Sequence, residues 1–326
     1  MSRSILITLL SLLAATPAAF ADASFRKTDP ALAAHVLALS PDNVRMDDVR
    51  DLARVGAPRI FVIQGSVALV SMRPFAEFLI AMGYPEDRLR DPHDGDYSRS
   101  SFGDSETLAG EVAWYYEHDA MMPMLIGHSQ GGMLAIRTLY ELAGTFHDAI
   151  HVVDPTTART LDRTTLRDPR TGAIRPVVGI KVSYAAALAT GKLARVLLGQ
   201  WSMLPRLRVI PDTVEDFTGF TLPGDIIAGN VFGDEPYRSL GTANVRNVTL
   251  PPAYSHIRLP LVRHLAEQAR TREWIDAYAP DAAPPLPADP EIDTANLLHA
   301  ADIWWSVKKH WCIEVQRALR AAQSAP

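Results

Sequence analysis

Residues 123–132 read Pro-Met-Leu-Ile-Gly-His-Ser-Gln-Gly-Gly, and the rest of the chain is interpreted outward from them. The apolar run leads into Gly127-His-Ser-Gln-Gly131, which places Ser129 at the centre of a G-x-S-x-G pentapeptide. This pattern is typical of a nucleophile elbow, a sharp strand-to-helix turn that exposes a serine hydroxyl. We expect glycine at 127 and 131 because side chains there would collide with neighbouring backbone, while Ser129 is held in a strained conformation.

Strand-like and helix-like segments alternate around this turn. Continuous apolar runs between turn residues predict strands at 59–64, 122–126, 149–153, 217–222 and 245–250. Helical spacing and end signals predict helices at 42–53, 74–82, 106–119, 132–143, 259–278 and 294–322. The alternation predicts the α/β class, with a mostly parallel central sheet flanked by helices on both faces. Functional groups should then gather at the carboxyl ends of the strands.

A long insertion separates the strand that ends near Asp154 from the strand that starts near Phe217. It covers about residues 155–216, which is too long for an ordinary connection. Its middle, residues 183–198, is rich in alanine and leucine and is predicted to be helical. We interpret the insertion as a helical cap over the site. The alternative is an extra crossover helix packed on the sheet.

A serine hydroxyl is a weak nucleophile, so Ser129 would need a base and a carboxylate that orients the base. His256 follows the last predicted strand and precedes the last core helix, and it is our candidate base. Asp225 follows the penultimate strand, 31 residues before His256, and is the favoured acid. Asp154, at the end of the strand after the elbow, is the alternative acid; Asp216 and Asp234 are weaker candidates.

An acyl-transfer site also needs donors for the developing oxyanion. These are usually the backbone N–H after the nucleophile and another from a loop that follows a neighbouring strand. In this chain they correspond to the amide of Gln130 and an amide of the turn after the strand at 59–64, either Ser66 or Val67.

The arrangement resembles the α/β-hydrolase superfamily over residues 59 to about 275. The likeness is carried by the Ile60–Gly65 strand and loop, Gly127–Gly131, Asp225 and His256. Gly-His-Ser-Gln-Gly is common among lipases and esterases, so the resemblance implies ester cleavage through an acyl-enzyme on Ser129, with no metal or organic cofactor. Gln64-Gly65 replaces the family's usual His-Gly, which leaves the oxyanion residue open between 66 and 67.

Two other function classes stay open from the sequence. An acyltransferase or a peptidase could use the same triad with a different acceptor or leaving group. A non-catalytic binding protein could use the same scaffold, because fold does not fix function. The expected partner is a small-molecule ester or a lipid, with transient contact to a membrane or lipid surface as a further alternative. The sequence does not indicate the oligomeric state.

The N-terminus predicts export. Met1-Ser-Arg-Ser precedes an apolar run at 5–15, and Ala19-Phe-Ala21 supplies a cleavage site, so residues 1–21 are interpreted as a signal peptide rather than a retained anchor. The mature protein would be periplasmic or secreted and begin near Asp22 or Ser24. The chain holds 1 cysteine, Cys312, so no intramolecular disulfide can form. With a net charge of −5 and no basic block, nucleic acid is not an expected partner.

The predicted domain organisation is a hydrolase domain at 24–280, followed at 281–326 by a proline-rich linker and a C-terminal helix packed on the domain. That helix carries Trp304, Trp305 and Trp311. Packing against the domain is the expected role of these rings, and contact with a lipid surface is the alternative. The acidic run at 91–96 lacks a recognised ligand spacing and is interpreted as a solvated loop.

Overall fold

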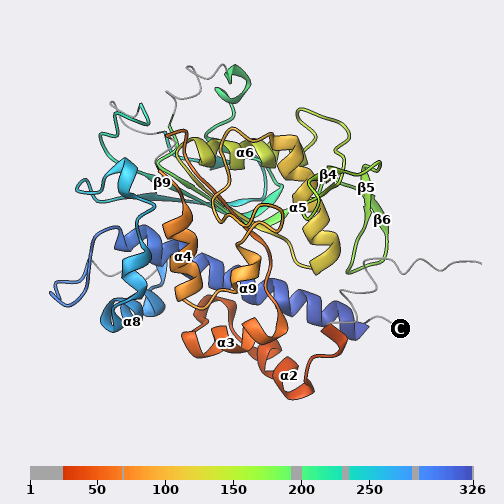
Figure 1. Cartoon of the computed structure of the whole chain (residues 1–326), viewed down its shortest axis with the longest axis horizontal. Coiled ribbons are helices and arrows are strands. Elements are labelled where there is room, and N and C mark those ends of the chain that lie inside the picture. The colour runs from red at the N-terminus through yellow and green to blue at the C-terminus, as the bar shows by residue number, and fades with distance from the viewer. Residues whose placement is uncertain (1–24, 68–69, 192–199, 230–234, 281–285, 325–326) are drawn as a thin grey trace, which may run out of the picture.

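A five-stranded, fully parallel sheet with the order β1-β2-β7-β9-β11 forms the centre of the molecule (Figure 1). The computed structural model describes residues 25–67, 70–191, 200–229, 235–280 and 286–324. The predicted signal peptide lies outside the described residues. The strands of the sheet are β1 (Ile60–Ile63), β2 (Met124–His128), β7 (Val182–Leu188), β9 (Val214–Thr221) and β11 (Asn244–Thr249).

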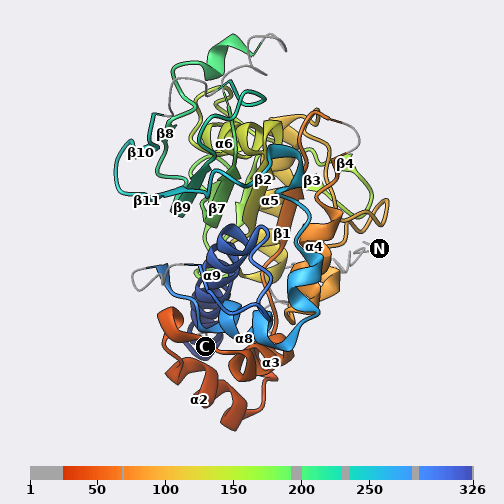
Figure 2. The same cartoon turned by 90° about the vertical axis from the view of Figure 1, so that its left-hand side faces the viewer.

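Helices cover both faces of this sheet, as Figures 1 and 2 show from two sides. The first side holds α4 (Arg73–Ala81), α8 (Ala269–Ala277) and α9 (Leu297–Ser324), with α2 (Pro30–Ala38) and α3 (Met46–Val55) packed against α9 farther from the sheet. The second face carries α5 (Ser105–Asp119) and α6 (Gln130–Leu142). None of the helices in the described ranges is long and apolar enough to cross a membrane.

Small elements complete the chain. They are the strand pairs β3 (Val153–Asp154) with β4 (Arg159–Thr160), β5 (Thr165–Arg167) with β6 (Ile174–Pro176), and β8 (Val209–Ile210) with β10 (Arg238–Ser239). The 3₁₀ turns are η1 (Pro41–Asn43), η2 (Glu86–Arg88), η3 (Trp201–Met203), η4 (His256–Arg258) and η5 (Arg263–Ala266).

The strands β1, β2 and β7 are buried along their whole length because both of their faces are covered. In β1, Ile60 and Val62 pack with the α4 and α9 side of the core, while Phe61 and Ile63 pack with α5 and α6. Successive side chains of a strand point to opposite faces, so a strand with helices on both sides shows no polar alternation. This confirms the class predicted from the sequence, an α/β fold with a parallel sheet between two helical layers.

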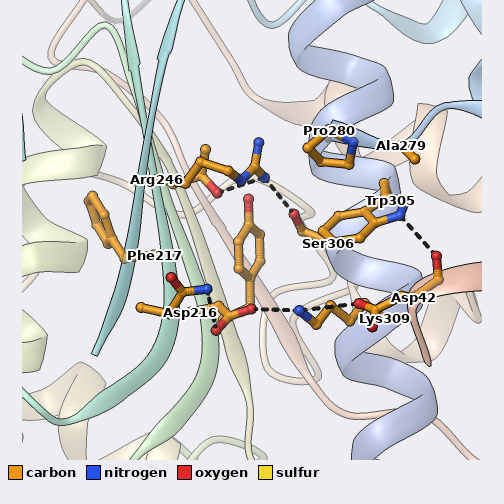
Figure 3. A pocket seen from close by; sticks show the side chains of 12 residues that line it. Asp42, Asp216, Phe217, Arg246, Ala279, Pro280, Trp305, Ser306 and Lys309 are labelled. Carbon is orange, nitrogen blue, oxygen red and sulfur yellow. Dashed lines mark hydrogen bonds and ion pairs between the residues drawn. The ribbon is translucent and has the colours of Figure 1, made fainter. Parts of the chain in front are cut away.

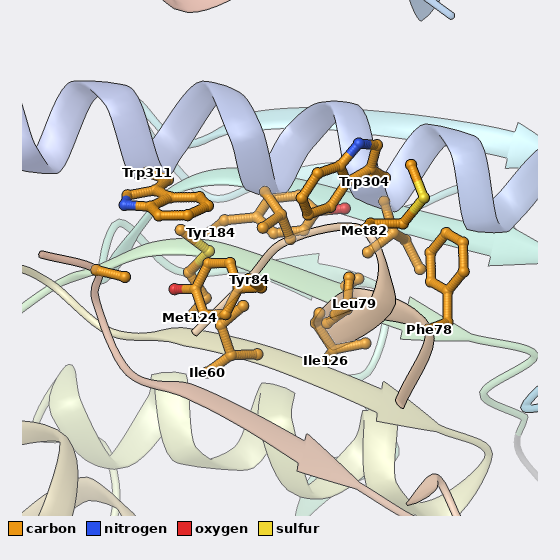
Figure 4. Packing of buried hydrophobic residues seen from close by; sticks show 14 of the residues in the cluster. Ile60, Phe78, Leu79, Met82, Tyr84, Met124, Ile126, Tyr184, Trp304 and Trp311 are labelled. Carbon is orange, nitrogen blue, oxygen red and sulfur yellow. The ribbon is translucent and has the colours of Figure 1, made fainter. Parts of the chain in front are cut away.

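The C-terminal helix α9 is part of the core. Its Trp304 and Trp311 are fully buried, and Figure 4 shows them pointing from the helix toward the sheet residues Met124 and Tyr184. The Trp311 ring meets Tyr84 edge-on at 4.7 Å between centroids, and its indole N–H donates to the carbonyl of Gly56 at 2.7 Å. The expectation that the tryptophan-bearing helix packs on the domain agrees with this arrangement.

The predicted helical cap is wrong over the residues that the structure describes. Residues 182–188, expected in a helix, form β7 at the centre of the sheet between β2 and β9. Their alanines let α6 approach closely, since a Cβ added at Gly132 would lie 3.1 Å from the Ala187 Cβ. Tertiary packing thus overrides alanine's helix propensity. The rest of the predicted helix, 192–199, lies outside the described residues.

Two neighbouring predictions also need correction. The strand expected in the sheet at 149–153 survives only as β3, which pairs antiparallel with β4 outside the sheet. The helix expected over 259–278 is replaced by the short turn η5 and by α8, preceded by the turn η4. The described residues of the stretch 155–216 therefore supply small strands and a central strand where a cap was expected.

Candidate active site

Ser129 sits on a strained turn between β2 and α6. Its backbone has φ 52° and ψ −119°, a conformation that residues with a Cβ rarely adopt. A Cβ added at Gly127 would lie 2.4 Å from the Gly131 backbone, and one at Gly131 would lie 2.2 Å from the Ile63 carbonyl oxygen. These close approaches confirm the steric reason for the two glycines, and the serine residue is partly exposed.

Asp225 and His256 form a buried hydrogen-bonded pair. The His256 Nδ1–H donates to Asp225 Oδ2 at 2.6 Å, and the two side chains are only 4% and 1% exposed. The other carboxylate oxygen of Asp225 accepts the Ala228 N–H at 3.0 Å, which fixes its orientation. Since the Nδ1–H donates a hydrogen bond to the carboxylate, the proton stays on Nδ1 and the Nε2 lone pair can accept a proton. This is the electrostatic arrangement of an oriented general base.

The elbow and this pair lie together at the carboxyl edge of the sheet. His128, the residue before Ser129, lies 2.9 Å through its Nε2 from the carbonyl oxygen of His256, and the two rings are 4.9 Å apart. Gly65, which follows β1, lies against the elbow, since a Cβ added there would be 3.1 Å from the Ser129 Cβ. Four strands, β1, β2, β9 and β11, therefore end in loops that converge on one place.

The alternative acids are engaged elsewhere. Asp154 accepts hydrogen bonds from the Thr156 N–H and hydroxyl and from the Thr157 hydroxyl, at 2.8, 2.7 and 3.0 Å, within the turn after β3. Partial burial acts to raise the pKa of Asp154, but these hydrogen bonds hold that pKa below its ordinary value. Asp216 lies in the amino-terminal half of β9, and Asp234 is outside the described residues. The structure thus joins Asp225, and not Asp154, to His256.

The expected oxyanion donors adjoin the serine. Gln130 is the first residue of α6, so its N–H has no acceptor within the helix and lies at the positive end of the helix dipole. The Gln130 side chain is buried and donates to Gln200 Oε1 at 2.8 Å. Ser66 is partly exposed and Val67 is 47% exposed, on the loop whose Gly65 contacts the elbow. The backbone amides of Ser66 and Val67 remain the predicted donors from that loop.

His128 is a site residue that the sequence reasoning missed. It is buried, and burial together with the adjacent His256 lowers its pKa to about 3, so the ring is neutral. The only signal in the sequence is its place beside the serine, which does not reveal which group the ring contacts.

A cavity lies at the other end of the strands, between β9, β11 and α9 (Figure 3). It has a volume of about 450 Å³ and is lined by Asp216, Arg246, Trp305 and Lys309 among others. Arg246 is bonded through both terminal nitrogens to Asp302, and Lys309 lies 3.2 Å from Asp216. Its charged groups are thus engaged in ion pairs that join α9 to the sheet.

Within the described ranges, no three histidine, cysteine or acidic side chains are placed to hold a metal ion. Comparison of the chain with known protein families, with curated proteins and with solved structures finds no significant match.

Proposed function

We propose that this protein is a serine hydrolase of the α/β-hydrolase type that cleaves carboxylic esters through an acyl-enzyme on Ser129. The observation that carries the proposal is the buried 2.6 Å hydrogen bond between Asp225 and His256, placed beside a serine that is held at a φ of 52°. Serine, acid and base come from the ends of three parallel strands, in the order along the chain that the resemblance implies.

The reaction proceeds in two halves. The Ser129 Oγ attacks the ester carbonyl carbon while His256 Nε2 takes the hydroxyl proton, and the tetrahedral intermediate then expels the alcohol, which receives that proton. Water next attacks the acyl-enzyme with His256 again as base, and collapse releases the acid and restores the hydroxyl. Asp225 stays ionised and stabilises the imidazolium form of His256.

The oxyanion of each intermediate is bound by backbone donors. Gln130 N–H supplies one hydrogen bond, and the amide of Ser66 or Val67 supplies the second. Each such donor is worth about 3 kcal/mol of transition-state stabilisation.

The surface around the site favours an apolar substrate. Of the ten strongly exposed large hydrophobic residues in the described part of the chain, seven lie on the loops after β1, β7, β9 and β11. We call these seven the apolar rim: Val67, Trp201, Leu204, Ile226, Ile227, Ile257 and Leu261. Ile226 and Ile257 directly follow the acid and the base in the chain. Clustered exposed apolar side chains mark binding surfaces, so we assign the rim to the acyl chain and to transient contact with a lipid surface.

We also propose that the protein acts after export, in the periplasm or outside the cell, on the basis of its first 21 residues.

Turnover of p-nitrophenyl esters by the wild type and by Ser129→Ala tests the function. We expect the wild type to hydrolyse them and the variant to lose about four to six orders of magnitude in kcat. Its far-ultraviolet circular dichroism and thermal midpoint should match those of the wild type. Retained turnover in the folded variant would remove Ser129 from the mechanism. A protein that binds esters without hydrolysing them would instead be a binding module.

A further inference from the structure

The turn that carries His256 is held by side chains from two distant parts of the chain. This turn, η4, is only three residues long, His256–Arg258, so regular secondary structure contributes little to its position. Asn296 Nδ2 donates to the carbonyl of Arg258 at 2.8 Å, and His299 Nε2 lies 2.8 Å from the carbonyl oxygen of Leu259. His128 meets the His256 carbonyl from the other side.

The hydrogen-bond partners of the His128 and His299 imidazoles determine which ring nitrogen carries the proton. A carbonyl oxygen can only accept, so His128 and His299 must each carry the proton on Nε2 and donate it. Within the described part of the chain, the Nδ1 atoms of both rings are buried without a hydrogen-bond partner. Burial lowers the pKa of His299 to about 4, and the pKa of His128 is depressed similarly, so both rings stay neutral single donors near pH 7.

These donors are themselves rigidly held. The His299 ring is surrounded by Phe75, Phe220 and Tyr254, with centroids 5.9 to 6.4 Å away. The Tyr254 hydroxyl donates to the Thr294 carbonyl at 3.0 Å and accepts the Leu298 N–H at 3.1 Å. The segment before His256 is thereby tied to the start of α9, the same region that supplies Asn296 and His299.

We propose that His128, Asn296 and His299 are positioning residues that set the His256 imidazole relative to Ser129, so that the C-terminal helix is part of the catalytic apparatus. This inference rests on the proposed function. A general base must stay within hydrogen-bond reach of its proton donor, and a displacement of about 1 Å can cost about 100-fold in rate. Asp225 orients the ring, while the three donors hold the backbone from which the ring projects.

The alternative is that these hydrogen bonds only satisfy buried carbonyls and add stability. The positioning role and the purely structural role can be separated by two replacements of each histidine, one that keeps the hydrogen-bond donor and one that lacks it. Glutamine places an amide N–H near the position of a histidine Nε2–H, whereas leucine fills similar space with no donor. Gln316 provides a matched control, since this buried residue of α9 donates in the same way to the carbonyls of Val36 and Leu39, at 3.0 and 2.9 Å, far from η4.

The experiment compares kcat, KM and the fluorophosphonate labelling rate in His128→Leu, His128→Gln, His299→Leu, His299→Gln, Asn296→Gly and Gln316→Leu. Glycine is used at 296 because that residue has a φ of 62°. We expect the two leucine variants at histidine positions and Asn296→Gly to lose tenfold to about 100-fold in kcat with KM changed less than about twofold. The glutamine variants should recover most of this loss. Gln316→Leu should lower the thermal midpoint and keep kcat.

The outcomes separate the two proposals. A wild type that hydrolyses esters, with folded variants whose kcat follows only their thermal midpoints, would overturn the positioning role and leave the proposed function standing. Equal losses in the leucine and glutamine variants would overturn it as well. A wild type that is neither active nor labelled would overturn both.

Discussion

Among the described residues, two buried histidines face aspartates at opposite ends of the sheet, and we propose a catalytic role for only one of these pairs. At the carboxyl edge, the His256 Nδ1–H donates to Asp225 at 2.6 Å beside the elbow serine. At the amino-terminal end, His310 Nε2 lies 3.0 Å from Asp216 Oδ2 but without the alignment of a hydrogen bond. Figure 3 shows Asp216 linked instead to the ammonium group of Lys309.

The surroundings of each pair explain the difference. Burial acts to raise the pKa of Asp216, but its contacts with His310 and Lys309 hold that pKa well below the ordinary value. His310 is buried in the middle of α9 and stacked on Tyr184 at 5.6 Å. Such a ring connects a helix to a sheet. A histidine beside an aspartate therefore indicates a general base only where the ring nitrogen that does not face the aspartate can reach the proton of a nucleophile.

Removing the carboxylate of each pair should produce the largest contrast. Asp225→Asn should lower kcat about ten-thousand-fold, because the amide no longer holds the required tautomer or stabilises imidazolium. Asp216→Asn should keep kcat within about twofold and lower the free energy of unfolding by about 1 kcal/mol through the weakened ion pair. Ester turnover and urea denaturation measure the two effects. Comparable kinetic losses in both variants would show that the two ends do not differ as described.

The sequence predicted the carboxyl edge of the sheet better than it predicted the centre of the fold. The elbow and β1 are marked by local patterns, an apolar run that ends in turn residues. Asp225 and His256 were selected by their positions after predicted strands, and the structure brings them together. The strand β7 was mistaken for a helix because a strand buried on both faces shows no period, and its alanines favour helix locally.

The positioning residues could not be found from the sequence for a different reason. His128 and His299 donate to backbone carbonyls, which every residue has, so no pattern of side chains marks the partner. His299 is packed inside the core on α9, and its polar contact is with the Leu259 carbonyl at the end of the turn that carries His256. Such contacts depend on how α9 lies against the sheet, which local signals do not specify.

A smaller effect should distinguish the apolar rim from exposed apolar residues elsewhere. Ile226→Ser, at a residue 72% exposed beside Asp225, should lower kcat/KM about tenfold for long-chain esters and little for acetate esters. Ile174→Ser is the matched control, because Ile174 is 62% exposed on β6, away from the site. An acyl-chain series with each variant measures the effect. Equal responses of the two variants would refute the assignment of the rim.

A further expected effect concerns pH and the buried neutral imidazoles. The pKa of His299 in the folded protein is about 4, below the unfolded value of about 6.5, so the unfolded chain binds more protons between these values. Stability is thus retained above about pH 6.5 and falls on acidification toward pH 4, by about 1 kcal/mol per pH unit for this ring.

Urea denaturation from pH 7 to pH 4.5 checks this expectation. His299→Gln should show a shallower loss of stability with falling pH than the wild type. Gln316→Leu, which removes no titratable group, should be destabilised by a similar amount at every pH. An unchanged slope in His299→Gln would mean that the ring is not held neutral in the folded protein.

The most direct test of the central claim, that the Asp225–His256 pair activates Ser129, is the site and rate of fluorophosphonate labelling, read by intact mass and peptide mapping. We expect one adduct, on Ser129, formed at least about a thousandfold more slowly in His256→Ala. An adduct on another residue, no adduct at all, or equal labelling of the wild type and His256→Ala would contradict the account.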